Sequence, residues 1–184
     1  LPQNELPEFL RLLEAYDSKG RLLTKLAIKL LVLTFVRSGE LRGAEWSEFD
    51  LEGKTWRIPA TRMKMKTEPL VPLSLQAIDV IEQIRPITSQ YSLVFPSERH
   101  RNESMSDNTM RKAIFMMGYD GNTSGKSKAV PHGFRATASS ILNEQGFNPD
   151  AIERQLAHME RNSVRAAYTH HARYLEERAE MMQW

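Results

Sequence analysis

The first part of the chain alternates apolar and polar residues with the period of an α-helix. Apolar residues near the N-terminus recur three or four positions apart, which predicts an amphipathic helix that ends by Gly20: Leu6, Phe9, Leu10, Leu13 and Tyr16. The next segment, about Leu22 to Val36, is apolar on nearly every side, which is typical of a helix buried at the centre of a domain. Ser38 then suits an N-cap and predicts a short helix from Gly39 to Glu45.

After Trp46 the pattern changes to short extended runs. The segment FDLEGKTWRIPA has a Glu52-Gly53 turn between two runs of apolar and aromatic residues, which predicts a β-hairpin. LVPLS predicts a third short strand, and Pro69 and Pro72 place that strand at an edge of the sheet. The basic stretch TRMKMKTE lies between the second and third strands.

Helical patterns with capping residues return in the second half. The predicted elements are Ser74 to Ile84, a helix capped by Ser106 and ended by Gly118, His132 to Glu144, and a helix that begins at Asn148 and Pro149. We therefore predict a mainly α (α+β) fold: one helical domain over residues 1–184 with a small three-stranded antiparallel sheet.

The composition is that of an ordinary soluble domain. Of 184 residues, 41% are hydrophobic and 26% are charged, the net charge is +2, and there is no cysteine that could form a disulfide or a thiolate metal site. No apolar run approaches the roughly 20 residues that span a bilayer, so we expect no membrane contact and a cytoplasmic location. Because the chain opens at Leu1 and not at Met, we interpret it as the C-terminal fragment of a longer protein.

Four separate stretches carry side chains suited to chemistry: TFVRSGEL, RMKMKTEPLVPL, PHGFR, and LAH followed ten residues later by a tyrosine. Each has an ordinary explanation when it is taken singly. A helix-start arginine pairs with a nearby glutamate, a hairpin lysine is usually solvated, a histidine near a helix C-terminus is favoured by the helix dipole, and a helical tyrosine usually packs in the core. The side chains concerned are Arg37, Lys64, His132, Arg135, His158 and Tyr168.

In this order and spacing, the four stretches resemble the tyrosine recombinases, also called phage-type integrases, over nearly the whole chain. TFVRSGELRGAEWSEFDLE resembles the first-arginine box, VPHGFRATASSIL the His-x-x-Arg box, and LAHMERNSVRAAYTH the His-to-Tyr segment. Phe35 departs from the family pattern, which usually has glycine there, and the His-to-Tyr interval is about one residue longer than usual. The resemblance is to the branch carried by prophages and genomic islands.

The resemblance implies a helical catalytic domain of the DNA breaking-rejoining type, which cleaves and rejoins strands through a covalent 3′-phosphotyrosine without a cofactor or a metal. Arg37 and Arg135 would clamp the two nonbridging phosphate oxygens, a task that suits permanent cations with forked donors. Tyr168 would be the nucleophile. Its pKa, ordinarily about 10, requires nearby cations such as the two arginines and His132 to help it ionise.

The remaining roles also follow from the resemblance. Lys64 would be the general acid that protonates the departing 5′-oxygen, and Lys66 is the alternative, since alternation puts both on one face of an extended segment. His158 would hydrogen-bond to the scissile phosphate. Glu40 would support Arg37, although a glutamate in a capping box has the same spacing.

Two features of the C-terminal stretch have weaker interpretations. Tyr174 is a rival nucleophile, but it lies outside the family interval from His158, so we assign it to packing. His170 and His171 suggest a metal site, yet adjacent histidines point different ways on a helix and no carboxylate has a suitable spacing. We therefore predict no metal and leave the role of the two histidines open.

Basic residues outside these stretches are candidates for phosphate contacts, although solvated loop charge explains any one cluster equally well. They are Arg57, Arg62, Lys66, Arg111 and Lys112. The partners expected from the resemblance are double-stranded DNA attachment sites, a homotetramer formed on DNA through the C-terminal tail, and accessory DNA-bending or directionality proteins. The tail would pack either on a neighbouring subunit or on its own domain.

Two other functions remain open at this point. A type IB topoisomerase relaxes DNA by the same phosphotyrosine chemistry, and a DNA-binding domain that has lost catalysis would serve regulation or assembly. The family boxes favour site-specific recombination, that is, integration or excision of a mobile element. The core-binding and arm-binding domains that precede the catalytic domain in the family have no counterpart in these 184 residues.

Overall fold

The computed structural model describes residues 1–16, 21–62, 69–156 and 174–184. Helices dominate the described residues: α1 (Leu6–Glu14), α2 (Leu22–Thr34), α3 (Ser38–Arg42), α4 (Leu75–Thr88), α5 (Asp107–Met116), α6 (Gly133–Glu144), α7 (Pro149–Gln155) and α9 (Leu175–Gln183). The strands are β1 (Phe49–Asp50), β2 (Thr55–Arg57) and β3 (Leu70–Pro72), and short 3-10 turns occupy Gln3–Glu5, Trp46–Glu48 and Ala60–Arg62. No helix within the described ranges is both long enough and apolar enough to cross a membrane.

The strands form an antiparallel sheet in the order β1-β2-β3, which confirms the predicted hairpin and the edge position of the third strand. Trp56 of β2 is opposite Phe49 on one side and Val71 on the other. Its buried indole stacks on the Phe49 ring at a centroid distance of 4.9 Å. The sheet is therefore fastened to the core through the middle of its central strand.

The hairpin turn differs in detail from the predicted Glu52-Gly53 turn. The left-handed residue is Lys54, with φ 51°. The N–H of Gly53 donates to Asp50 Oδ1 at 2.8 Å, and a Cβ at position 53 would meet the Asp50 carboxylate at 2.4 Å. A side chain at position 53 would therefore displace the exposed Asp50 carboxylate, whereas the backbone angle of Gly53 is not in the left-handed region.

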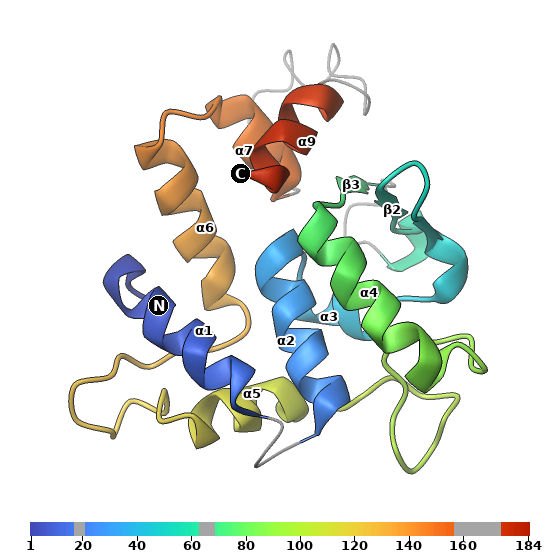
Figure 1. The fold of residues 1–184 in the computed structure, drawn as a ribbon, viewed down its shortest axis with the longest axis horizontal. Coiled ribbons are helices and arrows are strands. Elements are labelled where there is room, and N and C mark those ends of the chain that lie inside the picture. The colour runs from blue at the N-terminus through green and yellow to red at the C-terminus, as the bar shows by residue number, and fades with distance from the viewer. Residues whose placement is uncertain (17–20, 63–68, 157–173) are drawn as a thin grey trace.

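Helix α2 lies at the centre of the molecule, as its apolar sequence predicts. It contacts α1, α3, α4, α5 and α6, and Figure 1 shows these helices arranged around it. A second, smaller apolar cluster joins α6, α7 and α9 through Leu142, Ile152, Leu156, Met181 and Met182. Helix α9 contacts α7 and β3, so the C-terminal tail packs on its own domain in this structure.

Side-chain capping explains the starts of α3, α4, α5 and α7. Ser106 and Asn148 accept from the backbone N–H groups two residues on, as their sequences predict. The predicted N-cap Ser38 is wrong by one residue: Arg37 is the N-cap of α3, with φ −72° and ψ 147°. The Arg37 N–H donates to Glu40 Oε2 at 2.8 Å, so the glutamate and not the serine determines where this helix begins.

Helix α2 ends at Thr34, two residues before the predicted boundary at Val36, and Phe35 is its C-cap. Phe35 has the left-handed conformation, with φ 57° and ψ 17°, and its N–H donates to the Leu31 carbonyl at 3.0 Å. This conformation costs an L-residue roughly 1 kcal/mol or more. The half-buried ring packs against the second apolar cluster, which offsets the strain. The turn redirects the chain so that Arg37 begins α3.

Because residue 35 is left-handed, we predict that glycine gives a more stable protein than alanine at this position, which reverses the usual order in a helix. Phe35→Gly and Phe35→Ala both lose the ring, but only glycine relieves the backbone strain. We expect Phe35→Gly to have the larger free energy of unfolding, by about 1 kcal/mol, in urea denaturation of the two variants.

Gln145 is the matched control, because it is exposed and ends α6 with an ordinary right-handed φ of −80°. At this position alanine should be more stable than glycine by about 0.5–1 kcal/mol. The same order at both positions would contradict a left-handed end of α2.

Candidate active site

Arg37 and Glu40 form the first part of the candidate site, at the start of α3. Arg37 Nη1 donates to Glu40 Oε1 at 2.7 Å, and the Arg37 N–H donates to the other carboxylate oxygen at 2.8 Å. The Glu40 side chain is 8% exposed and that of Arg37 is 35% exposed. The glutamate therefore acts both as a helix-start acceptor and as a support for the guanidinium, and one side of Arg37 stays open to solvent.

Arg135 approaches the same place from α6. Its guanidinium is buried and donates through Nη1 to the Phe35 carbonyl and through Nη2 to the Leu156 carbonyl. Burial, and after it the positive charge of Arg37, lower the pKa of Arg135. Within the described part of the chain, the buried Arg135 Nε–H has no hydrogen-bond partner. The structure thus brings the two predicted clamp arginines together and leaves a buried donor unused.

His132 precedes Arg135 at the N-terminus of α6. It is exposed, and its carbonyl accepts from the Arg135 N–H at 3.3 Å. The loop that leads to it is held against the turn before α1 and the end of α5. The Ser127 N–H donates to Glu5 at 2.9 Å, and Lys126 Nζ donates to the Met117 carbonyl at 3.2 Å. Hydrogen bonds from Ser127 lower the pKa of Glu5.

Four predicted side chains lie outside the described residues: Lys64, Lys66, His158 and Tyr168, together with His170 and His171 whose role was left open. Their sequence neighbours are described. The 157–173 segment begins after Leu156, whose carbonyl binds Arg135, and ends before Tyr174. The 63–68 segment begins after Arg62 and ends before Pro69, next to β3.

Arg62 holds the chain immediately before the 63–68 segment. Its guanidinium forms an ion pair with Glu48 and donates to the Glu40 carbonyl at 3.1 Å. Trp56 Nε1 donates to the same Glu48 carboxylate at 2.9 Å. Burial raises the pKa of Glu48, while the Trp56 hydrogen bond and the Arg62 charge oppose that shift. The geometry gives Arg62 an internal role, and its predicted DNA contact stays a prediction.

The other predicted phosphate contacts in the described residues lie at two separate places. Arg57 is exposed on β2, whereas Arg111 and Lys112 are exposed on α5. Figure 1 shows α5 well away from the sheet. Arg111 Nη2 donates to Asn108 Oδ1 at 2.5 Å, an exposed contact within its own helix. These cations therefore do not form one continuous patch.

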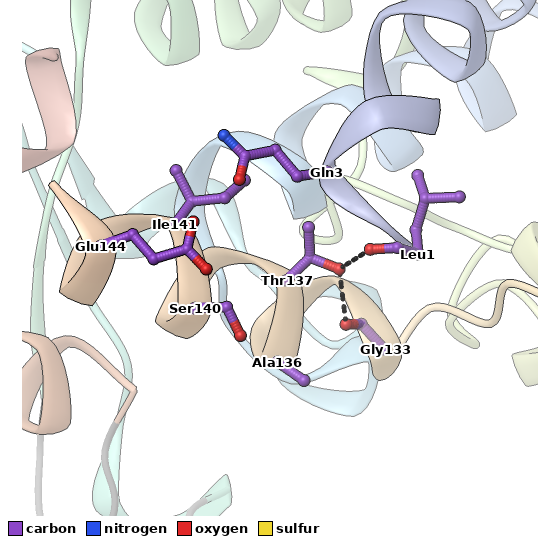
Figure 2. Close-up of a pocket in the computed structure, with 8 residues that line it drawn as sticks. All are labelled: Leu1, Gln3, Gly133, Ala136, Thr137, Ser140, Ile141 and Glu144. Atoms are coloured by element: carbon purple, nitrogen blue, oxygen red, sulfur yellow. Dashed lines mark hydrogen bonds between the residues drawn. The ribbon is translucent and has the colours of Figure 1, made fainter.

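A pocket of about 360 Å³ lies between the N-terminal residues and α6. Thr137 Oγ1 donates there to the Leu1 carbonyl at 2.7 Å, and Figure 2 shows it between Leu1 and Gly133. None of the predicted catalytic residues that the structure describes lines the pocket. It lies on a different face of α6 from the buried Arg135, so we do not assign the chemistry to it.

Two polar residues behind the site were missed by the sequence interpretation. Arg178 and Gln155 are both buried and hydrogen-bond to each other at 2.7 Å. The signal for Arg178 was its place on α9, three residues after Leu175 and three before Met181, in line with the apolar residues of the tail. Tyr174 takes a left-handed φ of 63° and its carbonyl accepts from the Arg178 N–H.

Across residues 1–16, 21–62, 69–156 and 174–184, no three His, Asp or Glu side chains are grouped so as to hold a metal ion. The cations at the site are arginines, and their fixed positive charge suits an anionic phosphate group. The arrangement can therefore bind a phosphodiester between α3 and α6 through charge and hydrogen bonding.

The Glu48–Arg62 ion pair predicts that Arg62 and Arg57 contribute differently to stability, although the sequence predicts a phosphate contact for both. Arg62→Met leaves the buried Glu48 charge without its counterion, so the free energy of unfolding should fall by about 2–3 kcal/mol. Arg57→Met removes an exposed charge and should change it by less than about 0.5 kcal/mol. Urea denaturation of both variants at neutral pH measures the difference. Equal stability of the two would remove the structural role of Arg62.

Comparison with known proteins identifies relatives of this chain. The pattern of the "Phage integrase family" matches residues 1–174. The integrase of Enterobacteria phage P4 is 47% identical over 197 residues, covering 100% of this chain and 44% of that protein. The integrase of Shigella phage Sf6 is 37% identical over 185 residues, covering 100% of this chain and 46% of that protein. The chain spans less than half the length of either relative.

Solved structures show the same fold at low sequence identity. The Tn1549 transposon integrase in complex with transposon right end DNA has a TM-score of 0.71 and 17% identity, covering 98% of this chain and 64% of that one. The XerH recombinase bound to its difH substrate has a TM-score of 0.68 and 20% identity, covering 97% of this chain and 51% of that one. These similarities confirm the predicted fold class.

The matched family pattern covers nearly the whole chain, and the phage P4 relative covers all of it. The helical fold with its small antiparallel sheet is the fold of the structural neighbours. The chain therefore belongs to the phage integrase family of tyrosine recombinases.

Proposed function

We propose that this chain catalyses site-specific DNA recombination, which integrates or excises a mobile element through a covalent 3′-phosphotyrosine. The observation that carries the proposal is the meeting of Arg37 and Arg135 beside the end of α2. The two arginines come from helices almost 100 residues apart in the sequence, and each is held by acceptors of the protein itself. Membership of the integrase family supports the same chemistry.

The two arginines stabilise the charge that develops on the phosphate. In the transition state, negative charge concentrates on the two nonbridging oxygens, and forked donors can bind both. Glu40 and the Phe35 carbonyl hold the two guanidinium groups before DNA arrives, so little reorganisation is needed at the moment of reaction. Among the described residues the buried Nε–H of Arg135 has no acceptor, so it is a further donor that a bound phosphate oxygen could satisfy.

The covalent step conserves the phosphodiester bond energy. The Tyr168 oxygen attacks phosphorus and gives its proton to His132, the bond to the 5′-oxygen breaks, and that oxygen leaves with a proton from Lys64. A 5′-hydroxyl of the partner strand then attacks the phosphotyrosine and releases the tyrosine, so the number of phosphoester bonds is unchanged. His132 and His158 would assist through hydrogen bonds to the phosphate and the nucleophile.

Double-stranded DNA is the proposed partner. The Tn1549 and XerH structures contain DNA, and the exposed side of Arg37 suits a phosphate backbone. A homotetramer on DNA through the tail, accessory bending or directionality proteins and a cytoplasmic location stay predictions, as does the assignment of residues 1–184 as the catalytic fragment of a longer integrase. Since α9 packs on its own domain here, such a tetramer requires a different contact or a rearranged tail.

The nucleophile assignment predicts opposite results for two tyrosine variants. The probe is a pool of nicked suicide duplexes with a randomised core, which traps the covalent adduct for denaturing gels without added metal. Tyr168→Phe removes the attacking oxygen and should lower adduct formation by about 1000-fold or more. Tyr174→Phe keeps the ring and the backbone and should form adduct at the rate of the unaltered chain.

Other outcomes favour other functions. Loss of adduct only in Tyr174→Phe would overturn the choice of nucleophile. Absence of adduct from the unaltered chain, with DNA binding retained, would favour a non-catalytic DNA-binding domain. Relaxation of a supercoiled plasmid of arbitrary sequence would favour a type IB topoisomerase.

The general acid can be identified by changing the leaving group. Lys64→Ala should slow cleavage about 100- to 10,000-fold on ordinary DNA, because the 5′-oxygen must leave with a proton. A duplex with sulfur in place of that bridging oxygen should restore the rate to within about tenfold, since a thiolate leaves without protonation. Lys66→Ala is the control and should need no rescue. Rescue of Lys66→Ala alone would exchange the roles of the two lysines.

A further inference from the structure

A buried arginine on the last helix connects the elements on which the site is built. Arg178 of α9 is 2% exposed. Its Nε and Nη2 donate to Gln155 Oε1 at 3.1 and 2.7 Å, and Nη2 also donates to the Leu70 carbonyl at 2.7 Å. One guanidinium thus binds the end of α7 and the start of β3 at the same time.

Gln155 extends this connection to the central helix. Its Nε2 donates to the Thr34 carbonyl at 2.9 Å, at the end of α2. The neighbouring carbonyl, of Phe35, accepts from Arg135, which also binds the carbonyl of Leu156 next to Gln155. Gln155, at the end of α7, is therefore bonded directly to Thr34, and the next residue, Leu156, is connected to Phe35 through Arg135.

Each anchor point of this network adjoins a stretch with a proposed catalytic residue. Leu70 follows closely after the 63–68 segment that contains Lys64. Gln155 lies two residues before the 157–173 segment that contains Tyr168. Thr34 lies three residues before Arg37 in the sequence. Arg178 thus connects Leu70 and Gln155 directly, and Thr34 through Gln155. These residues lie close in sequence to the proposed general acid, nucleophile and phosphate clamp.

Stability alone explains this arrangement poorly. Burial, and after it the charge of Arg154, lower the pKa of Arg178 to about 10. The acceptors that the described residues supply are the neutral oxygens of Gln155 and Leu70. An apolar side chain of similar volume usually stabilises a buried position as well as an ion does. What the guanidinium adds is a forked donor that binds two separate elements in one geometry.

We propose that Arg178 is a positioning residue, which acts through Gln155 and Leu70 to hold the end of α7 and the start of β3 in place relative to the arginine clamp. These two elements are the described neighbours of the stretches that contain Tyr168 and Lys64. The proposal rests on the recombinase function proposed above. A displacement of about 1 Å in a reacting group can cost about 100-fold in rate.

The test compares two buried residues of α9. Arg178→Met keeps a similar volume but removes the donors, whereas Met182→Ala removes apolar packing of the same helix and keeps the network. The single-turnover rate of cleavage of the nicked duplex pool is measured for each variant, at a temperature the same number of degrees below the Tm of that variant. We expect Arg178→Met to cleave about 100-fold more slowly than the unaltered chain, and Met182→Ala to stay within about threefold. Arg178→Lys, which keeps the charge but lacks the fork, should be slowed about tenfold.

The sulfur-substituted duplex gives a readout that a purely structural role would not change. If Arg178 positions Lys64 through Leu70, the sulfur leaving group should recover at least about tenfold of the rate lost in Arg178→Met. Equal rates for Arg178→Met and Met182→Ala, or no recovery with sulfur, would overturn the proposal. Adduct formation by the unaltered chain tests the recombinase function separately.

A second measurement needs no activity. Amide hydrogen exchange in β3 and in the last turn of α7 should accelerate about tenfold or more in Arg178→Met and not in Met182→Ala, since only the former loses the connection between these elements. Unchanged protection in both segments would contradict the positioning role even if the chain cleaves no DNA.

Discussion

The last carbonyl groups of α2 need hydrogen-bond donors, and the donors that they bind determine where most of the site residues lie. A helix leaves its last carbonyls without helical partners, and burying them unpaired would be costly. The left-handed turn at Phe35 presents the carbonyls of Thr34 and Phe35 to α7 and α6, where Gln155 and Arg135 bind them. Because Arg37 follows directly, the same turn places both arginines of the proposed clamp.

Arginine is used here as a structural connector as much as a ligand for phosphate. Arg62, Arg135 and Arg178 each donate to backbone carbonyls of distant segments. The guanidinium group suits this role because it keeps its charge when it is buried and offers several donors in a fixed plane. Arg57, by contrast, is exposed to solvent on β2. Burial, more than sequence context, separates the arginines that build the site from those available to a nucleic acid.

Local signals predicted the elements well and their connections less well. The apolar α2, the hairpin and the caps at Ser106 and Asn148 follow from periodicity and from short-range hydrogen bonds, which a sequence contains in full. Ser38 was wrong as an N-cap because the Glu40 side chain reaches back to the Arg37 N–H. The functions of Arg62 and Arg178 were not predictable, since their acceptors lie 14 and 23 residues or more away along the chain.

The sequence by itself determined the family, the order of the elements and the candidate chemistry, because these depend on residue types at fixed spacings. Only the tertiary structure decided which arginines are buried and that α9 docks on its own domain. It also decided that the Glu40 carboxylate accepts from both the backbone N–H and the guanidinium of Arg37. The physical reason is that burial and hydrogen-bond partnership are properties of the folded assembly. A single guanidinium can bind a phosphate, a carboxylate or a carbonyl, and the neighbours that folding provides decide among them.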